Sequence, residues 1–184
     1  MHEALLYESL EQGRVKCNIC TWRCQINPGK AGACGMYLNQ AGRLYSLNYA
    51  LPSSIAADPV EKKPLNHFYP GSKVFSMGSW GCNFSCRDCQ NWQISIEVGC
   101  GIPGSVQKAP PEDAVRMAVN IGAEGIAWTY NEPTVWFEYT LDTACLAKEK
   151  GLYAVYVTNG FITPEALDLI GPYLDAWRVD VKGF

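Results

Sequence analysis

The feature that most constrains the fold is a regular alternation of short apolar segments and helical patterns across the second half of the chain. Apolar segments short enough to be buried strands cover 73–78, 126–130, 153–157 and 176–181. A helical pattern with a proline in its first turn lies between each segment and the next. Strands separated by single helices imply a parallel sheet with right-handed crossovers, so we expect an α/β fold.

The composition describes a globular protein and narrows the functional classes. Of the 184 residues, 48% are hydrophobic and 18% are charged, which suits one domain of ordinary size with a real core. The 15 basic and 18 acidic side chains give a formal charge of −3, which argues against nucleic acid as a partner. No apolar run approaches the ~18–20 residues of a membrane span, and residues 1–4 lack the pattern of a signal peptide. We therefore expect a cytoplasmic protein with no membrane partner, whose nine cysteines bind metal rather than form disulfides.

Three cysteines in one short polar loop carry the strongest chemical signal. Cys82, Cys86 and Cys89 directly follow the first predicted strand. Three thiolates are one too few for a closed tetrahedral zinc site or for a fully ligated [4Fe–4S] cluster. A [4Fe–4S] cluster held by three thiolates leaves one iron open to an outside ligand, which is what a cluster that performs chemistry needs.

A second group of four cysteines lies within 18 positions near the N-terminus. Four soft ligands at this density predict a closed metal site, which is typical of a structural role. The residue types do not distinguish zinc from a second iron–sulfur cluster, because both accept four thiolates. Buried thiols without a metal are the alternative, since cysteine is often a core residue. The four residues are Cys17, Cys20, Cys24 and Cys34.

Polar residues follow each of the later predicted strands. The carboxyl ends of parallel strands meet at one edge of a sheet, where α/β proteins bind their ligands. Taken singly, these residues are equally well explained by a helix N-terminus or a turn. Polar sets at the ends of four consecutive strands, the cysteine loop included, favour a shared site. The candidate residues are Asn131, Glu132, Thr158, Asn159, Asp180 and Lys182.

The cysteine spacing and its flanking words resemble the radical S-adenosylmethionine (SAM) superfamily. The words DPVEKKPL (58–65), HFYPGS (67–72), GCNF (81–84) and CQNW (89–92) are similar to the AmmeMemoRadiSam-system radical SAM enzymes. These enzymes are relatives of the pyruvate formate-lyase activating enzymes, and the resemblance runs from about Cys17 to the last residue. It implies a partial barrel of six strand–helix units. Only four strands are predicted and the chain stops directly after the fourth, so we expect a barrel truncated at that point.

The resemblance also implies roles for the residues after the second and third barrel strands. Glu132 and Asn131 occupy the place of a loop that holds the amino group of SAM, although both glycines of that loop are lost here. Thr158 and Asn159 match a Thr-Asn-Gly word of the cofactor site. The sequence identifies no catalytic side chain beyond these cofactor-binding residues.

The resemblance also implies roles for two residues after the fourth strand. At two other positions the sequence departs from the family pattern. Lys182 is implied to face the SAM carboxylate, and Asp180 is implied to help hold a monovalent cation. Val157 stands where an aspartate usually precedes the Thr-Asn-Gly word, which leaves the cation site open. Asp88 stands where an aromatic residue usually contacts the adenine.

The reaction that the resemblance implies is reductive cleavage of SAM at a [4Fe–4S] cluster to methionine and a 5′-deoxyadenosyl radical, which abstracts hydrogen from a substrate. The cofactors are the cluster and SAM, with zinc or a second iron–sulfur cluster as a further candidate. The implied partners are an electron donor such as flavodoxin or ferredoxin and, by analogy with the activating enzymes, a protein substrate. Two other functional classes stay open. One is an iron–sulfur protein that transfers electrons or senses redox state, and the other is a cysteine-rich zinc-binding module.

These observations divide the chain into three predicted parts. Residues 1–41 carry a helix over 1–16, with three leucines on one face, followed by the four-cysteine segment. Residues 42–72 form a strand and a connecting loop. The charged residues 61–63 of this loop are best explained as a solvated face, while the family resemblance favours a place at the border of the active-site mouth. Residues 73–184 form the N-terminal part of the barrel.

Overall fold

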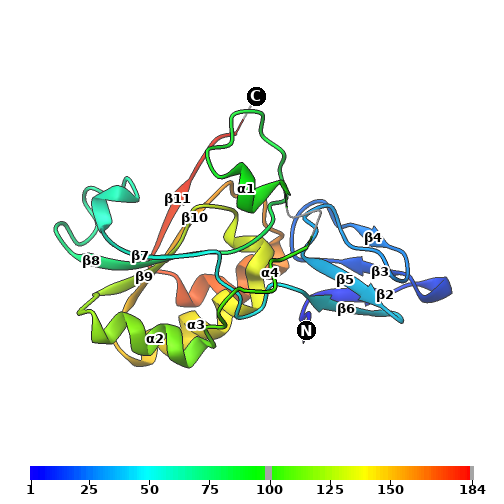
Figure 1. Ribbon diagram of the computed structural model, residues 1–184, viewed down its shortest axis with the longest axis horizontal. Helices are drawn as coiled ribbons and strands as arrows, with labels where there is room; N and C mark the ends of the chain where they lie inside the picture. The colour runs from blue at the N-terminus through cyan, green and yellow to red at the C-terminus, as the bar shows by residue number, and fades with distance from the viewer. Residues whose placement is uncertain (98–100, 183–184) are drawn as a thin grey trace.

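The computed structural model describes residues 1–97 and 101–182 and places two kinds of β-structure side by side (Figure 1). A five-stranded sheet with its helices holds the second half of the chain. Two small antiparallel sheets hold most of the N-terminal part and lie beside the helices of the larger sheet. Among the described residues, no helix combines the length and the apolar character that a membrane span needs.

The large sheet has the strand order β11–β10–β9–β8–β7, and its first four strands are parallel. The expected parallel α/β sheet is therefore confirmed, and the predicted strand bounds agree to within about two residues, which is the usual uncertainty of strand ends. The parallel strands are β8 (Lys73–Gly78), β9 (Gly125–Trp128), β10 (Tyr153–Thr158) and β11 (Ala176–Val179).

Each connection between parallel strands contains a helix, as the sequence predicts. In Figure 1 the three main helices lie together on one side of the sheet. The side chain of Thr163 accepts a hydrogen bond from the backbone N–H of Ala166 and so caps the last of them. The helices are α1 (Trp92–Ser95), α2 (Pro111–Asn120), α3 (Phe137–Glu149) and α4 (Pro164–Ile170), with the short turns η4 (Pro133–Trp136) and η5 (Gly171–Tyr173).

Alternate residues of the central strands point to opposite faces of the sheet and enter two separate clusters. Phe75 and Ile126 belong to the larger cluster, which includes the apolar faces of the helices. Val74 and Val155 pack on the other face with Val60, which comes from the segment between β7 and β8. Both faces of the parallel sheet are thus covered around β8, β9 and β10, whereas the residues of β11 stay partly exposed.

The edge of the large sheet next to β8 is formed by an antiparallel strand that the sequence analysis assigned to a connecting loop. β7 (Ser54–Pro59) pairs with β8 over six positions, from Ser54 opposite Gly78 to Pro59 opposite Lys73. An edge strand buries fewer of its side chains, and the proline ends the pairing, so its sequence carries a weak strand pattern. The turn η2 (Val60–Lys62) follows it directly.

The predicted helix over residues 1–16 is wrong, because this segment forms two strands, a turn and the start of a third strand. β1 (His2–Glu3) pairs with β6 (Arg43–Ser46), and β2 (Tyr7–Ser9) pairs with β3 (Val15–Cys17). A short helix is marginal on its own, and pairing with later strands satisfies the backbone better. β6 is the strand expected after residue 42. The remaining N-terminal elements are η1 (Glu11–Gly13), β4 (Gln25–Ile26) and β5 (Tyr37–Gln40).

A buried carboxylate joins the N-terminal sheets to α3. Glu138 accepts hydrogen bonds from the Leu5 backbone N–H at 3.0 Å and from the Tyr37 hydroxyl at 2.7 Å. Burial raises the pKa of Glu138, and these two donors partly offset that effect. The two parts of the fold therefore share polar contacts inside the protein as well as apolar packing.

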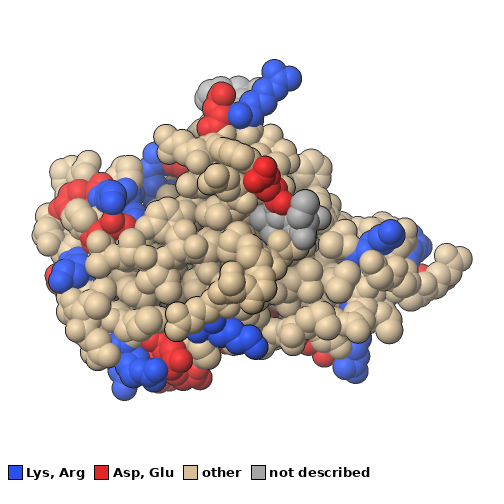
Figure 2. Space-filling model, in the orientation of Figure 1, with Lys and Arg blue, Asp and Glu red and all other residues tan. Residues whose placement is uncertain are grey.

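The surface charges are mixed. Figure 2 shows basic and acidic side chains next to one another around the margin of this face, with largely uncharged surface between them. A nucleic-acid site gathers basic side chains on one face. The described residues of this face carry no such patch, in agreement with the formal charge of −3.

Candidate active site

The carboxyl ends of the parallel strands surround a cavity of about 650 Å³. All three cysteines of the 82–89 loop and all six strand-end candidates line this cavity. The structure thus brings together the residues that the sequence analysis selected at separate strand ends. The four N-terminal cysteines are not among its lining residues.

The cysteine loop presents three thiols to the cavity. Cys82, Cys86 and Cys89 are free and partly exposed. Burial raises the pKa of Cys82 to about 11, while the backbone N–H of Phe84, 3.4 Å from Cys82 Sγ, acts in the opposite direction. A thiol in such surroundings becomes a thiolate only beside a strong positive charge, which a metal centre supplies.

The loop begins at Gly81, where it touches the N-terminal part of the chain. Gly81 has a φ of +78°, and a Cβ there would lie 2.5 Å from the Cys34 carbonyl oxygen and 2.6 Å from Met36 Cγ. Its backbone N–H donates to the Ile94 carbonyl oxygen at 2.7 Å. Only glycine fits this position, so the start of the cysteine loop is fixed against the segment that carries Cys34.

Glu132 is the most deeply buried charged group of the cavity, with 2% of its surface exposed. Its Oε1 accepts hydrogen bonds from the Thr134 backbone N–H at 3.0 Å and from the hydroxyls of Thr134 and Thr158, each at 2.6 Å. Its Oε2 accepts from the Asn159 backbone N–H at 2.8 Å. Burial raises the pKa of Glu132, and the four donors partly offset it. The carboxylate is therefore held in one position between the ends of β9 and β10.

The two candidate asparagines use their side chains to hold loops together. Asn131 Nδ2 donates to the Gly81 carbonyl oxygen at 2.7 Å, and its Oδ1 accepts from the Ser79 backbone N–H at 2.9 Å. Asn159 Nδ2 donates to Asn83 Oδ1 at 2.7 Å. Both residues thus connect their own strand ends to the cysteine loop, and they shape the cavity wall.

Asp180 and Lys182 lie at the β11 side of the cavity and are more exposed. Lys182 Nζ is 3.0 Å from Asp180 Oδ2, and Arg178 Nη1 is 2.7 Å from Asp180 Oδ1. The Asp180 backbone N–H donates to the Thr158 carbonyl oxygen at 2.8 Å, which fixes the chain after β11 beside β10. Asp180 is therefore engaged by two cations of the protein itself.

Comparison with known proteins identifies the fold that carries this site. A profile of the radical SAM superfamily matches residues 79–184, which is more than half of the chain. The chain belongs to the radical SAM superfamily. It is also 43% identical over 183 residues to the uncharacterized protein MJ0808 of Methanocaldococcus jannaschii, a match that covers 100% of this chain and 54% of that protein. The chain thus spans about half the length of this relative.

Membership of the radical SAM superfamily implies a [4Fe–4S] cluster and SAM as cofactors, and the cavity suits both. Three soft sulfur donors from one loop face it, as a three-thiolate cluster requires. Its volume of about 650 Å³ falls within the range of small-molecule sites, roughly 300–1,000 Å³. The buried carboxylate of Glu132 complements the ammonium group of an amino acid such as SAM.

The four N-terminal cysteines line a separate, small pocket of this radical SAM protein. Burial raises the pKa of Cys34 to about 12 and also raises the pKa of Cys17. Among residues 1–97 and 101–182, no group of three or more histidine, cysteine, aspartate or glutamate side chains is arranged to hold a single metal ion.

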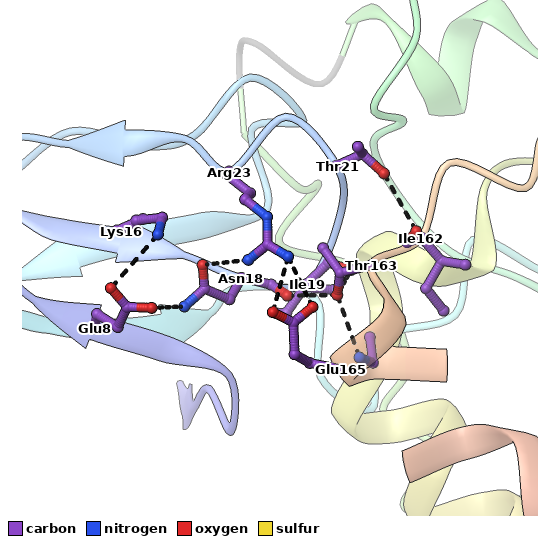
Figure 3. A network of polar contacts seen from close by, with 10 residues as sticks. Glu8, Lys16, Asn18, Ile19, Thr21, Arg23, Ile162, Thr163 and Glu165 are labelled. Atoms are coloured by element: carbon purple, nitrogen blue, oxygen red, sulfur yellow. Dashed lines mark hydrogen bonds and ion pairs between the residues drawn. The ribbon is translucent and has the colours of Figure 1, made fainter. Parts of the chain in front are cut away.

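The N-terminal cysteine segment is fixed against α4 and the loop before it by a polar network (Figure 3). Arg23 Nη2 lies 2.8 Å from both carboxylate oxygens of Glu165, and Arg23 Nη1 donates to Asn18 Oδ1 at 3.1 Å. The hydroxyl of Thr21 donates to the Ile162 carbonyl oxygen at 3.2 Å. These contacts place the segment beside the strand end that carries Thr158 and Asn159.

Asn83 lies between the two cysteine groups. Trp22 Nε1 donates to the Asn83 carbonyl oxygen at 2.8 Å, and Cys82 Sγ is 3.8 Å from Asn83 Oδ1. Burial raises the pKa of Cys20, and a hydrogen bond with the Asn83 side chain partly offsets this. The N-terminal segment therefore contacts the cysteine loop of the radical SAM domain directly.

The sequence analysis assigned no chemical role to the residues at the β7 side of the cavity, which are Asp58, Lys62, Lys63 and Tyr130. The prediction of a solvated face at 61–63 is wrong for Lys63, whose surface is 4% exposed. The sequence did carry a signal, because Asp58 precedes Lys62 by four residues and Lys63 by five. This spacing brings the opposite charges close together once a turn forms.

Proposed function

We propose that this radical SAM chain binds a [4Fe–4S] cluster through Cys82, Cys86 and Cys89, and binds SAM through the residues at the strand ends. The observation that carries the proposal is that these cysteines and strand-end residues line one cavity. When bound, the cluster would supply one electron to the SAM sulfonium, which yields methionine and a 5′-deoxyadenosyl radical for hydrogen abstraction. The chain's own residues bind and orient SAM and keep water away from it.

Glu132 is the proposed ligand of the SAM amino group. Its Oε2 accepts a single hydrogen bond from the described residues, so it retains acceptor capacity toward the cavity. Thr158 and the Asn159 backbone N–H hold the carboxylate in place before SAM binds, so little reorganisation is needed. A charge-assisted hydrogen bond in this buried position is stronger than one in water. Lys182, which is half-exposed, is the proposed partner of the SAM carboxylate.

The finer assignment is to the AmmeMemoRadiSam-system enzymes, relatives of the pyruvate formate-lyase activating enzymes. The support is the set of sequence words between residues 58 and 92. Under this proposal the electron comes from a flavodoxin or ferredoxin, and the substrate is a protein. Because the chain spans 54% of the relative's length, the electron donor and the substrate are proposals.

For the N-terminal cysteines we propose a second, structural metal site. The support is that Cys17, Cys20, Cys24 and Cys34 line one pocket and that the segment packs on the cysteine loop through Trp22. Four thiolates close the coordination of a metal centre and leave no position for a substrate. An iron–sulfur cluster and zinc remain the two candidates for its content.

The proposed function is tested by anaerobic reconstitution with iron and sulfide, followed by a deoxyadenosine assay with SAM and dithionite. Each of Cys82→Ala, Cys86→Ala and Cys89→Ala should lower the iron content by about one [4Fe–4S] cluster and abolish deoxyadenosine formation. Cys145→Ser is the matched control, because this cysteine lies on α3 outside both groups, and it should leave both readouts unchanged. Cys20→Ser should lower thermal stability and metal content before it affects SAM cleavage.

Four results would contradict these assignments. A triple variant of the loop cysteines that kept the full iron content would exclude the cluster assignment. A brown protein that never cleaves SAM would favour the electron-transfer class, and a colourless protein with stoichiometric zinc would favour the zinc module. A Cys20→Ser protein that folds normally but no longer cleaves SAM would make the N-terminal site a redox partner rather than a structural one.

A further inference from the structure

A buried charge cluster lies at the β7 side of the cavity and has no part in the proposed binding of SAM. Lys63 and Asp58 are 4% and 5% exposed, and Lys63 Nζ is 2.9 Å from Asp58 Oδ2. Lys62 Nζ is 2.8 Å from Asp58 Oδ1, and its side chain is 67% exposed. All three residues line the cavity. Two ammonium groups therefore share one carboxylate in its wall.

Tyr130 joins this cluster to the proposed SAM end of the cavity. Its hydroxyl donates to Asp58 Oδ2 at 3.3 Å, and its ring centre is 5.3 Å from Lys63 Nζ. Its backbone carbonyl accepts a hydrogen bond from Asn91 of the cysteine loop. Tyr130 has a φ of +73°, a strained conformation for a residue other than glycine that surrounding contacts must hold in place. Such strain is often found at ligand sites.

Stability alone does not account for this cluster. A buried ion pair pays a desolvation cost that often cancels its attraction, and apolar residues of the same size serve as well or better. One lysine would suffice to neutralise Asp58. The second leaves an excess positive charge in the wall of a cavity, and a cavity with low-dielectric walls concentrates that field on a bound ligand.

We propose that Lys62 and Lys63 form the substrate-binding end of the cavity and bind an anionic group of the substrate, either a carboxylate or a phosphate. This inference rests on the proposed function, which places SAM at the opposite end beside Glu132. Asp58 orients both ammonium groups. The exposed Lys62 can leave Asp58 and meet the incoming anion, whereas the buried Lys63 stays paired and keeps Asp58 neutralised.

The test measures anion binding to the 184-residue chain without cluster or SAM. Inorganic phosphate and, separately, malonate are titrated by calorimetry, and the tighter of the two identifies the chemical class. Lys62→Gln should weaken the binding of the preferred anion at least fivefold, while Lys62→Arg should keep it within about twofold because the charge is retained. Lys30→Gln is the matched control, since Lys30 is an exposed lysine that does not line the cavity, and it should bind as the parent does.

Several outcomes would overturn the inference. The first is that neither anion shows saturable binding. The second is that Lys62→Gln binds the anion as tightly as the parent does. The third is that Lys30→Gln loses as much affinity for the anion as Lys62→Gln. Circular dichroism on each variant checks that the fold is intact. Because no cluster or SAM is present, a chain that binds the anion but never cleaves SAM would contradict only the proposed function. A chain that cleaves SAM but binds neither anion would contradict only the present inference.

Discussion

At the scale of single residues, the site depends on two buried carboxylates whose pKa values shift in opposite directions. Burial raises the pKa of Glu132, and neutral or backbone donors offset it only in part. Burial would also raise the pKa of Asp58, but the ammonium groups of Lys62 and Lys63 outweigh it and hold that pKa well below its usual range. Asp58 therefore remains ionised at neutral pH and stays paired with both lysines.

The low pKa of Asp58 predicts a pH-dependent contribution to stability. Because the folded-state pKa lies below the unfolded value of about 3.9, the contribution is complete above that pH and is lost as the pH falls toward the folded-state value. Asp58→Asn should lower the free energy of unfolding by about 3 kcal/mol at pH 7, because it leaves Lys63 buried without its partner. Urea denaturation at pH 7 and pH 3 should show a smaller difference between parent and variant at the lower pH.

The matched control for this prediction is Asp113→Asn. Asp113 forms an ion pair with Arg116 on the surface of α2, and such exposed pairs contribute at most about 1 kcal/mol. A pH-independent effect of Asp58→Asn, or an effect no larger than that of Asp113→Asn, would contradict the assigned ionisation of Asp58.

Gly81 gives a second prediction at this scale, with Gly71 as an internal comparison. Both have a φ close to +80°, but a Cβ at Gly71 meets no atom within 4 Å, whereas one at Gly81 lies 2.5 Å from the Cys34 carbonyl oxygen. Gly71→Ala should cost about 1 kcal/mol for its backbone conformation alone. Gly81→Ala should cost about 2 kcal/mol more, because the loop must also move away from Cys34. Equal thermal stability of the two variants would mean that the loop is not fixed there.

At the scale of secondary-structure elements, the sequence was most informative where the pattern is local. β8 to β11 and their helices follow from apolar runs and prolines, and the site residues at their ends follow from parallel topology. β7 and β1 pair with strands well removed along the chain, such as Ser54 opposite Gly78 and His2 opposite Ser46, and the N-terminal strands are only two to four residues long. No local pattern could reveal them. The burial of Lys63 was missed for the same reason, since it depends on where β7 places Asp58.

The outer edge of β11 leads to a prediction about association. No strand of residues 1–97 or 101–182 pairs with that edge, and Val179 on it is 50% exposed. An unpaired edge with an apolar residue is a template for pairing with a second chain. The 184-residue chain should therefore self-associate at high concentration, and Val179→Lys should reduce the associated fraction in sedimentation experiments. Val119→Lys, on α2 with a similar exposure of 49%, should not.

At the scale of the whole molecule, the direction of β7 explains why two cysteine groups far apart in the sequence lie close together. Because β7 is antiparallel to β8, its first residue Ser54 lies opposite Gly78, at the end of β8 where the cysteine loop begins. The chain that precedes β7 therefore emerges at the same edge of the sheet as that loop. The hydrogen bond from Trp22 to Asn83 is a consequence of this geometry.

The hydrogen bonds of Glu138 determine whether the N-terminal part can be removed from the rest of the protein. Its two donors, Leu5 between β1 and β2 and Tyr37 on β5, both come from the N-terminal part of the chain, while Glu138 itself is part of α3. A truncated protein that lacked the first 41 residues would lose both donors of Glu138 together with β1 and β5, the two strands that pair with β6. The cysteine-rich segment is thus not a detachable module. Heating should melt it together with the large sheet in a single cooperative transition, and limited proteolysis should not release it as an intact piece.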